Sequence, residues 1–124
     1  MLSKEDIQAH CMSKKGAAET YPFDEFTLVY KVMGKMFALI PMNTDKTEPP
    51  RMNLKCDPIH AEILRETYES VIPGYHMNKK HWNTVICDDE IPQDEIYEMI
   101  DNSYDLVVKS LKKADKIKLM EIDN

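Results

Sequence analysis

Cysteine is scarce in this chain, and its three residues are widely spaced. Cys11, Cys56 and Cys87 form no CxxC pair, and their number is odd. Disulfide frameworks and cysteine-rich zinc sites need paired or clustered cysteines, so the sequence argues against both. We expect the three thiols to behave as small buried hydrophobic groups.

Long apolar segments are also missing. No stretch approaches the run of about 18 apolar residues that a membrane-spanning helix needs. The amino-terminal residues include Lys4, Glu5 and Asp6, where a secretory signal peptide requires an apolar region. We therefore expect no membrane association and no export, and we expect the protein to reside in the cytoplasm.

The common signatures of enzymes are absent as well. The chain contains no GxGxxG, GxxxxGK, HExxH or GxSxG motif, which mark cofactor-binding and hydrolase sites. A catalytic cysteine needs a neighbouring group that stabilises its thiolate. His10 adjoins Cys11, but adjacent residues of a helix point in different directions. The sequence thus predicts no enzyme activity, no cofactor and no bound metal.

The composition of the chain is typical of one soluble globular domain. It has 124 residues, of which 43% are hydrophobic and 31% are charged, with a formal net charge of -6. That length suffices for one hydrophobic core but not for two. We expect a single domain over residues 1–113, followed by a C-terminal tail over residues 114–124.

Local patterns divide the chain into helices and strands. Ser3 with Asp6 resembles a capping box and starts a helix that is expected to end near residue 14. Asp57 and Pro58 start a second helix, and an apolar stripe predicts a third over residues 92–111. Runs of β-branched and aromatic residues or alternating hydrophobicity predict strands at residues 27–33, 36–40, 51–56, 75–77 and 82–86.

The order of these elements defines the fold class. The sequence predicts an α+β two-layer sandwich with the order α-β-β-β-α-β-β-α, in which helices cover one face of an antiparallel sheet. Gly34 marks the turn of the first hairpin. In the tail, the alternating Ile117, Leu119 and Ile122 would form either a short extra strand or a frayed end.

The segment from residue 73 to residue 85 is the densest in groups that bind anions. Lys79 and Lys80 lie at an expected bend, where each would pair with a phosphate oxygen. Arg51 and Lys55 share one face of the preceding strand by alternation and would extend this patch. The candidate nucleic-acid-binding residues are Arg51, Lys55, His76, Asn78, Lys79, Lys80, His81 and Asn83.

Structural roles compete with this interpretation. Tyr75 and Trp82 would anchor the hairpin to the core, because an indole usually buries most of its surface. The asparagine at the bend would serve the turn conformation, and the lysines would simply be solvated. His76 and His81 would hold a metal only if a third ligand such as Asp88 came near.

Five motifs run in order through nearly the whole chain. They are ETYPF at residues 19–23, KMFA at 35–38, NLKCDP at 53–58, PGYHMNKKHWNT at 73–84 and SYDLV at 103–107. Together they resemble the MmcQ/YjbR family of small bacterial proteins. The resemblance implies an antiparallel sheet flanked by helices, like the secretion-chaperone and frataxin-like (CyaY-like) folds, and a proposed "double wing" DNA-binding role.

The sequence leaves several functional hypotheses open. The leading one is a non-enzymatic protein that binds DNA weakly, through phosphate contacts of the basic hairpin. The alternative is a protein-interaction or chaperone-like module, for which nine methionines supply adaptable apolar surface. A contiguous exposed apolar patch would favour that alternative. A third possibility, a small-ligand or enzyme site, would need a concave pocket lined by His76, His81 and a carboxylate.

Overall fold

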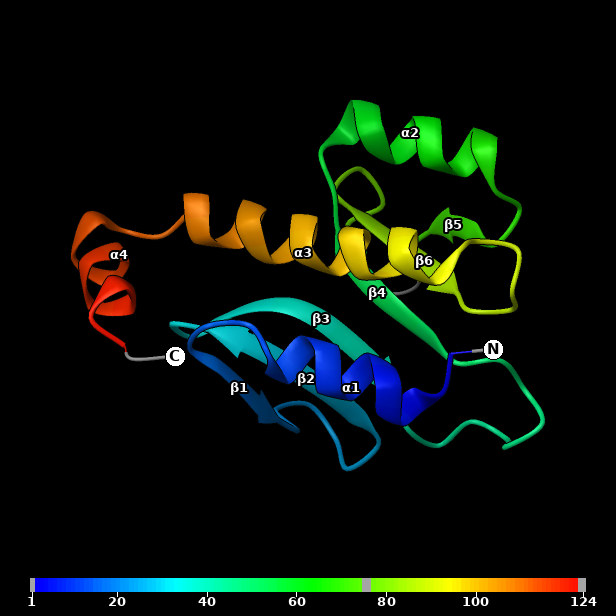
Figure 1. The fold of residues 1–124 in the computed structure, drawn as a ribbon, viewed down its shortest axis with the longest axis horizontal. Coiled ribbons are helices and arrows are strands. Elements are labelled where there is room, and N and C mark those ends of the chain that lie inside the picture. The colour runs from blue at the N-terminus through cyan, green and yellow to red at the C-terminus, as the bar shows by residue number, and fades with distance from the viewer. Residues whose placement is uncertain (1, 75–76, 123–124) are drawn as a thin grey trace.

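The computed structural model describes residues 2–74 and 77–122, which form six strands and four helices (Figure 1). In chain order these elements are α1 Lys4–Met12, β1 Ala17–Thr20, β2 Thr27–Val32, β3 Lys35–Pro41, β4 Arg51–Lys55, α2 Pro58–Thr67, β5 Val71–Pro73, β6 Trp82–Ile86, α3 Gln93–Lys109 and α4 Lys113–Met120.

All six strands belong to one antiparallel sheet, with the order β1-β2-β3-β4-β6-β5. The β2–β3 turn uses Met33 and Gly34, both with positive φ (49° and 83°), as the tight turn of a hairpin requires. A bulge follows in the same hairpin, where Phe37 is the extra residue between the pairs Tyr30–Ala38 and Lys31–Met36. The predicted hairpin and its turn at Gly34 are confirmed.

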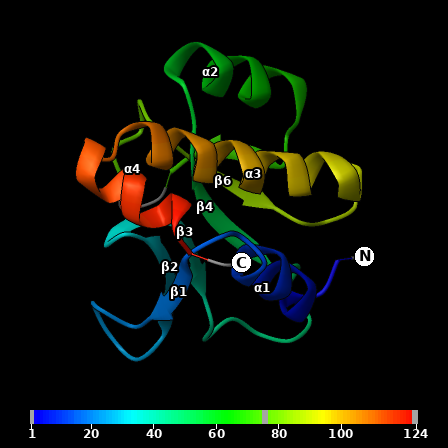
Figure 2. The same cartoon turned by 60° about the vertical axis from the view of Figure 1, so that its left-hand side comes forward.

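Helices α1, α2 and α3 cover one face of this sheet, and α3 runs across the strands (Figures 1 and 2). The core between the layers is fully buried at Tyr30, Phe37, Ile40, Met52 and Ile100. Burying a large apolar side chain contributes roughly 1.5–3 kcal/mol, so this layer supplies most of the driving force for folding. The predicted fold class, an α+β two-layer sandwich, is confirmed.

Two helix starts follow from local chemistry, as the sequence predicts. The hydroxyl of Ser3 accepts a hydrogen bond from the backbone of Asp6, and the carboxylate of Asp6 accepts one from the backbone of Ser3, both at 3.0 Å. The carboxylate of Asp57 caps α2 by accepting from the backbones of Ile59 and His60, with Pro58 at the first helical position.

Two strands differ from the sequence prediction. Strand β1 is not among the predicted strands, because Ala17–Thr20 lacks an apolar alternation and pairs only with β2, at the edge of the sheet. Strand β5 occupies Val71–Pro73, before the predicted range 75–77, and its Val71 is buried opposite Val85. Tyr75 and His76 lie outside the described residues, and Met77 is in a bend.

The tail forms α4, so both the extra strand and the frayed end were wrong. Of its alternating apolar residues, Leu119 is buried, whereas Ile117 is 47% exposed. Leu119 packs against Gly16, where an added Cβ would come within 2.6 Å of the leucine side chain. Gly16 also has a φ of +73°, which favours glycine. Helix α4 is therefore docked on the α1–β1 turn, and the domain end at residue 113 stays a prediction.

A side chain of α3, Ser103, bridges the two central strands of the sheet, β3 and β4. The ladder between β3 and β4 has two registered pairs, Ala38–Leu54 and Leu39–Asn53. Next to them the buried hydroxyl of Ser103 donates to the carbonyl of Phe37 at 2.6 Å and accepts from the backbone N–H of Lys55 at 2.8 Å. One side chain thus replaces a ladder contact and fixes the end of β4.

Candidate nucleic-acid interface

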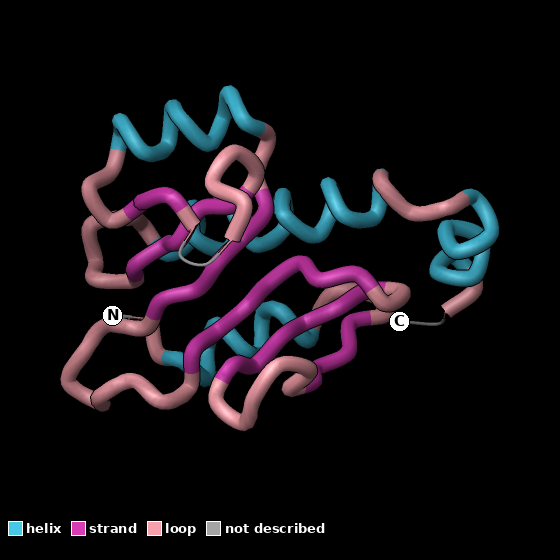
Figure 3. The backbone as a smooth tube through the Cα atoms, turned by 180° about the vertical axis from the view of Figure 1, so that it is seen from behind, coloured by secondary structure: helices cyan, strands magenta, loops and turns pink. Residues whose placement is uncertain are grey.

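The face of the sheet opposite the helices, here called the open face, carries the candidate site (Figure 3). In β2 the buried Tyr30 and Val32 point to the helix layer, so Lys31 between them points to the open face. In β4 the buried Met52 and Leu54 place Lys55 on the open face in the same way.

Trp82 lies beside Lys55 on the open face, as its registered partner across β4 and β6. It is only 9% exposed and packs with Val29 and Leu39, and Met77 also lies against this small cluster. The indole is therefore an anchor that ties the start of β6 to the sheet. So little of the ring reaches solvent that base stacking on it would require rearrangement.

The bend at residues 77–81 is held by its own polar groups. The side-chain oxygen of Asn78 accepts from the backbone of Lys80 at 2.9 Å, and its carbonyl accepts from the backbone of Trp82 at 3.0 Å. The ammonium of Lys79 donates to the carbonyl of Gly74 at 3.2 Å. Asn78 and Lys79 thus shape the bend, and Lys80 is exposed on it.

Arg65 of α2 fastens the bend from the other side. Its Nε donates to the side-chain oxygen of Asn83 at 2.7 Å, and its terminal nitrogen donates to the carbonyls of Lys79 and Trp82. Asn83 is only 2% exposed, so it does not face solvent as a phosphate contact would. The sequence prediction for Asn83 is corrected, because strand alternation turns it toward α2.

Arg51 is separated from the other predicted cations. It lies four residues from Lys55 along β4, about 13 Å at 3.3 Å per residue. Its guanidinium is 3.7 Å from the carboxylate of Glu48. Arg51 therefore shares the open face with Lys55 but lies at the other end of the strand and is partly neutralised.

Sequence reasoning missed Lys31 and Arg65. Alternation within β2 would have placed Lys31 on the same face as Val29, once the strand was assigned. Arg65 stands in a helix that is otherwise acidic, and no sequence pattern distinguishes it from a solvated residue.

We call Lys31, Lys55 and Lys80 the cationic row. Within residues 2–74 and 77–122, no carboxylate forms an ion pair with any of the three.

The two histidines of the hairpin do not form a described metal site. His76 lies outside the described residues, and the backbone carbonyl of half-buried His81 accepts from Cys56 at 2.8 Å. Asp88 follows the far end of β6, where it accepts from the hydroxyl of Ser70 at 2.6 Å. Among the described residues, no three His, Cys, Asp or Glu side chains are grouped to hold a metal ion.

The three thiols are parts of the core. Burial, with smaller contributions from Asp101 and Asp88, raises the pKa of Cys11 and of Cys87 to about 12. Burial also raises the pKa of Cys56. Each thiol is therefore protonated at neutral pH, and none has the thiolate character of a nucleophile.

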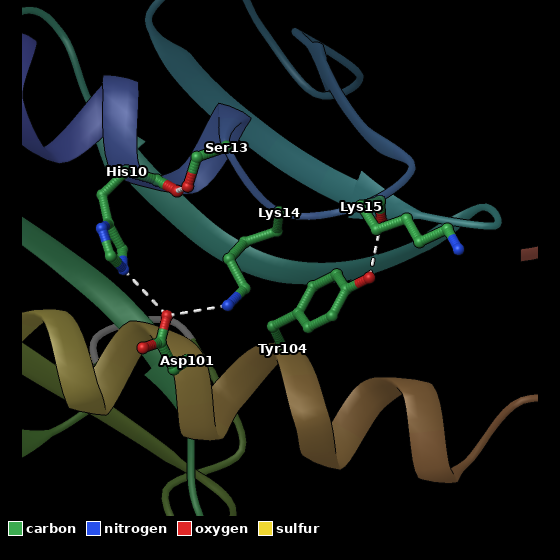
Figure 4. Close-up of polar contacts among 6 residues, drawn as sticks. All are labelled: His10, Ser13, Lys14, Lys15, Asp101 and Tyr104. Carbon is green, nitrogen blue, oxygen red and sulfur yellow. Dashed lines mark hydrogen bonds and ion pairs between the residues drawn. The ribbon is translucent and has the colours of Figure 1, made fainter. Parts of the chain in front are cut away.

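A second polar cluster joins α1 to α3 (Figure 4). The carboxylate of Asp101 is 2.8 Å from Nε2 of His10 and 2.9 Å from the ammonium of Lys14. Desolvation raises the pKa of Asp101, but the hydrogen bonds from Lys14 and His10 outweigh it and lower the pKa below its usual value. The Tyr104 hydroxyl donates to the carbonyl of Lys15 at 2.5 Å. Every group is satisfied by a neighbour, so the cluster acts as a clamp between two helices.

A cleft of about 190 Å³ lies between α2 and α3. The Tyr68 hydroxyl donates to the carboxylate of Glu95 in this cleft, and that hydrogen bond raises the pKa of Tyr68. Two carboxylates make the cleft unsuited to phosphate. Its lining consists of His60, Leu64, Thr67, Tyr68, Glu95, Glu98, Met99 and Asn102.

In the described part of the chain, none of the helices combines the length and apolar character needed to cross a bilayer. The longest, α3, carries five acidic side chains at Asp94, Glu95, Glu98, Asp101 and Asp105.

Comparison with known proteins places these features in a family. The chain is 32% identical to the uncharacterised protein YjbR of Escherichia coli K12, over 94% of this chain and 97% of that protein. It is 34% identical to the uncharacterised protein YyaQ of Bacillus subtilis 168, over 86% of this chain and 98% of that protein.

Solved structures agree with this relationship. The crystal structure of the Deinococcus radiodurans protein DR2400 matches with a TM-score of 0.87 and 39% identity, covering 100% of this chain and 92% of that one. A Pseudomonas syringae crystal structure matches with a TM-score of 0.72 at 23% identity, covering 85% and 98%, and shares the fold. The YjbR family model matches residues 12–106, which is more than half of the sequence. The chain therefore belongs to the YjbR family.

Proposed function

We propose that this protein is a non-catalytic binding protein of the cytoplasm that contacts nucleic-acid phosphates through the cationic row. The observation that carries the proposal is the position of Lys55 next to Trp82 and the 77–81 bend, on a sheet face without helices. Lys31 also faces the open side, two strands from Lys55, and Lys80 is exposed on the bend that precedes β6. The DNA-binding role proposed for the family points in the same direction.

Charge segregation makes local attraction compatible with a net charge of -6. Two acidic side chains lie on α2, three on the 88–90 loop and three in the first half of α3, and both helices belong to the helix layer. Because ionic interactions fade over roughly 10 Å at 0.1 M salt, phosphates at the open face are largely shielded from those acids. The cationic row therefore acts as a local positive field.

Three phosphate contacts support only weak binding. Non-specific complexes of this kind have dissociation constants of roughly 10⁻⁴ to 10⁻⁶ M at physiological salt, and their affinity falls as salt rises. The three residues of the row are lysines, which act as point charges on phosphates and do not recognise individual bases. We therefore propose binding that is salt-sensitive and has little sequence preference.

The test is a fluorescence-anisotropy titration of a labelled 20-nucleotide strand at 50 mM salt. The variant Lys55→Gln/Lys80→Gln removes two row charges but leaves Lys79, which shapes the bend, in place. We expect it to bind roughly 10- to 60-fold more weakly than the native chain, from a salt slope of about 0.7 per phosphate. The matched control is Lys4→Gln/Lys46→Gln, near the 42–50 loop, where Lys4 bonds Thr44.

The control should bind like the native protein. No binding by the native chain, or equal losses in both double variants, would remove the proposal. The second result would mean that only the overall charge matters.

A protein-interaction role is a second candidate, favoured by the β1–β2 loop. Three aromatic side chains are exposed there, Tyr21 by 48%, Phe23 by 64% and Phe26 by 46%. The carboxylate of Asp24 accepts from the backbones of Phe26 and Thr27 at 2.8 and 2.7 Å, which makes the loop rigid. Rigid aromatic side chains are typical anchors of protein interfaces. A partner captured by the native chain but not by Phe23→Ser would support this role.

A further inference from the structure

A second group of positive charges lies at one end of the molecule. Five lysines occur between residues 109 and 118 against one acid, Asp115. All five are exposed, and within the described residues none forms an ion pair. We call this group the lysine end; it consists of Lys109, Lys112, Lys113, Lys116 and Lys118.

Capping of helix ends does not explain most of these charges. Cations stabilise the C-terminal end of a helix, but other lysines already fill that role here. Lys35 donates to the carbonyl of Ser110 after α3, and Lys15 donates to the carbonyl of Met120 at the end of α4, both at 3.1 Å. The carbonyls at both helix ends thus have lysine partners from outside the group.

Three of the five lysines stand where the helix dipole disfavours them. Lys112 is the N-cap of α4, Lys113 is its first residue, and Lys116 lies one turn later. Cations near a helix N-terminus are destabilising, and Lys112 makes no side-chain cap hydrogen bond. Residues that destabilise the helix in which they lie often belong to a functional surface.

The lysine end continues the cationic row. Lys31 is two residues before the Met33–Gly34 turn, and Lys35, just after that turn, is bonded to Ser110 at the end of α3. The β2–β3 turn therefore joins the open face to the start of α4. Viewed from behind, the open face and α4 follow one another along the long axis of the molecule (Figure 3).

We propose that the nucleic-acid strand held by the cationic row continues over the β2–β3 turn onto the lysine end. This inference rests on the proposed function, because it extends the same ligand to a second surface. A polyanion fits both surfaces through one kind of contact, the phosphate–lysine pair. The exposed Ile117 and Met120 also lie on α4, so an anionic lipid surface is the rival ligand that the experiment must separate.

The experiment measures how the affinity of a labelled 20-nucleotide single strand changes with salt, from 25 to 200 mM. The test variant is Lys113→Glu/Lys116→Glu, because acids near the start of α4 suit its dipole and so preserve the helix. The control is Lys4→Glu/Lys46→Glu, which changes the net charge equally. Lys4 also begins its helix, α1, and Lys46 lies in an exposed loop.

Loss of two phosphate contacts should reduce the slope of log affinity against log salt by about 1.4. We expect that reduction in the test variant, while the control keeps the native slope. A test variant with the slope of the control would overturn the inference and leave the proposed function intact. No binding by the native chain would overturn both.

The last part of the experiment measures binding of the native chain and the test variant to vesicles that contain phosphatidylserine. Suppose that the native chain binds these vesicles, that Lys113→Glu/Lys116→Glu abolishes this binding, and that the salt slope for nucleic acid is unchanged. That result would assign the lysine end to lipid and overturn the inference. If the variant instead has a reduced salt slope for nucleic acid and unchanged binding to vesicles, the inference is supported.

Discussion

Arg65 donates a hydrogen bond from Nε to the buried side-chain oxygen of Asn83 at 2.7 Å, and this pair joins α2 to the start of β6. The same guanidinium donates to the carbonyls of Lys79 and Trp82, so it also fixes the bend that presents Lys80. The geometry of the cationic row thus depends on a residue of the helix layer. Changing Arg65 should affect both stability and binding.

We expect Arg65→Met to lower the free energy of unfolding by about 1.5–3 kcal/mol. The substitution keeps an apolar stem but leaves Asn83 without its charged donor, and hydrogen bonds to charged groups contribute about that much. Urea denaturation measures the change. Arg65→Lys keeps the charge without the planar fork and should recover only part of the loss. A loss below about 0.5 kcal/mol for Arg65→Met would show that the bend does not depend on this contact.

Ser103→Ala should destabilise the protein by about 1–3 kcal/mol, because it leaves the carbonyl of Phe37 and the N–H of Lys55 buried without a partner. Urea denaturation again gives the value. Ser13→Ala is the matched control, since that exposed hydroxyl bonds only to the carbonyl of His10 in its own turn. Equal stability of the two variants would contradict the role of Ser103 as a bridge between β3 and β4.

Protonation of Asp101 should lower the stability of the folded protein at acid pH. Its pKa is lowered in the folded protein, so the unfolded chain binds the proton more tightly. The stabilisation is therefore present above the unfolded pKa and is lost as the pH falls through the lower folded pKa. Because the carboxylate is 39% exposed, we expect no more than about 1 kcal/mol.

Unfolding of the native chain and of Asp101→Asn should be compared in urea at pH 7 and at pH 3 or below. The native chain should be the more stable at pH 7, and the difference should shrink in acid. A difference that stays constant or widens would show that the ion pairs with Lys14 and His10 do not stabilise the fold.

The cysteines should resist alkylation in the folded protein. Burial raises the pKa of Cys11 and Cys87 to about 12, so almost no thiolate exists at pH 8. Iodoacetamide should modify the native chain slowly and the urea-unfolded chain completely, as mass spectrometry would report. Rapid labelling of one thiol in the native state would contradict the assignment of all three to the core.

Local sequence signals predicted the parts of the fold that local chemistry determines. The capping box of Ser3 and Asp6 and the Asp57–Pro58 helix start depend on neighbours within three residues, and both are present. Strand β1 depends instead on pairing with β2, and its residues carry little strand preference of their own. The start of α4 lacks a cap signal, since Lys112 is its N-cap.

The candidate site was predictable only in part for the same reason. Alternation placed Arg51 and Lys55 on one face, but the ion pair of Arg51 with Glu48 depends on the conformation of the loop before β4, which no strand or helix pattern describes. Asn83 alternates with the open-face residues of β6, and its charged partner is Arg65, eighteen residues earlier. The contribution of Lys31 depends on a sheet order that brings β2 within two strands of β4.

A titration of the ¹⁵N-labelled protein with a 20-nucleotide single strand, followed by amide chemical shifts at 50 mM salt, tests the central claim most directly. We expect shifts at Lys31, Lys55 and residues 77–82, and none along α2 and the 88–90 loop. Shifts confined to the α2–α3 cleft or to the 21–26 loop, or no shifts at millimolar strand, would contradict it.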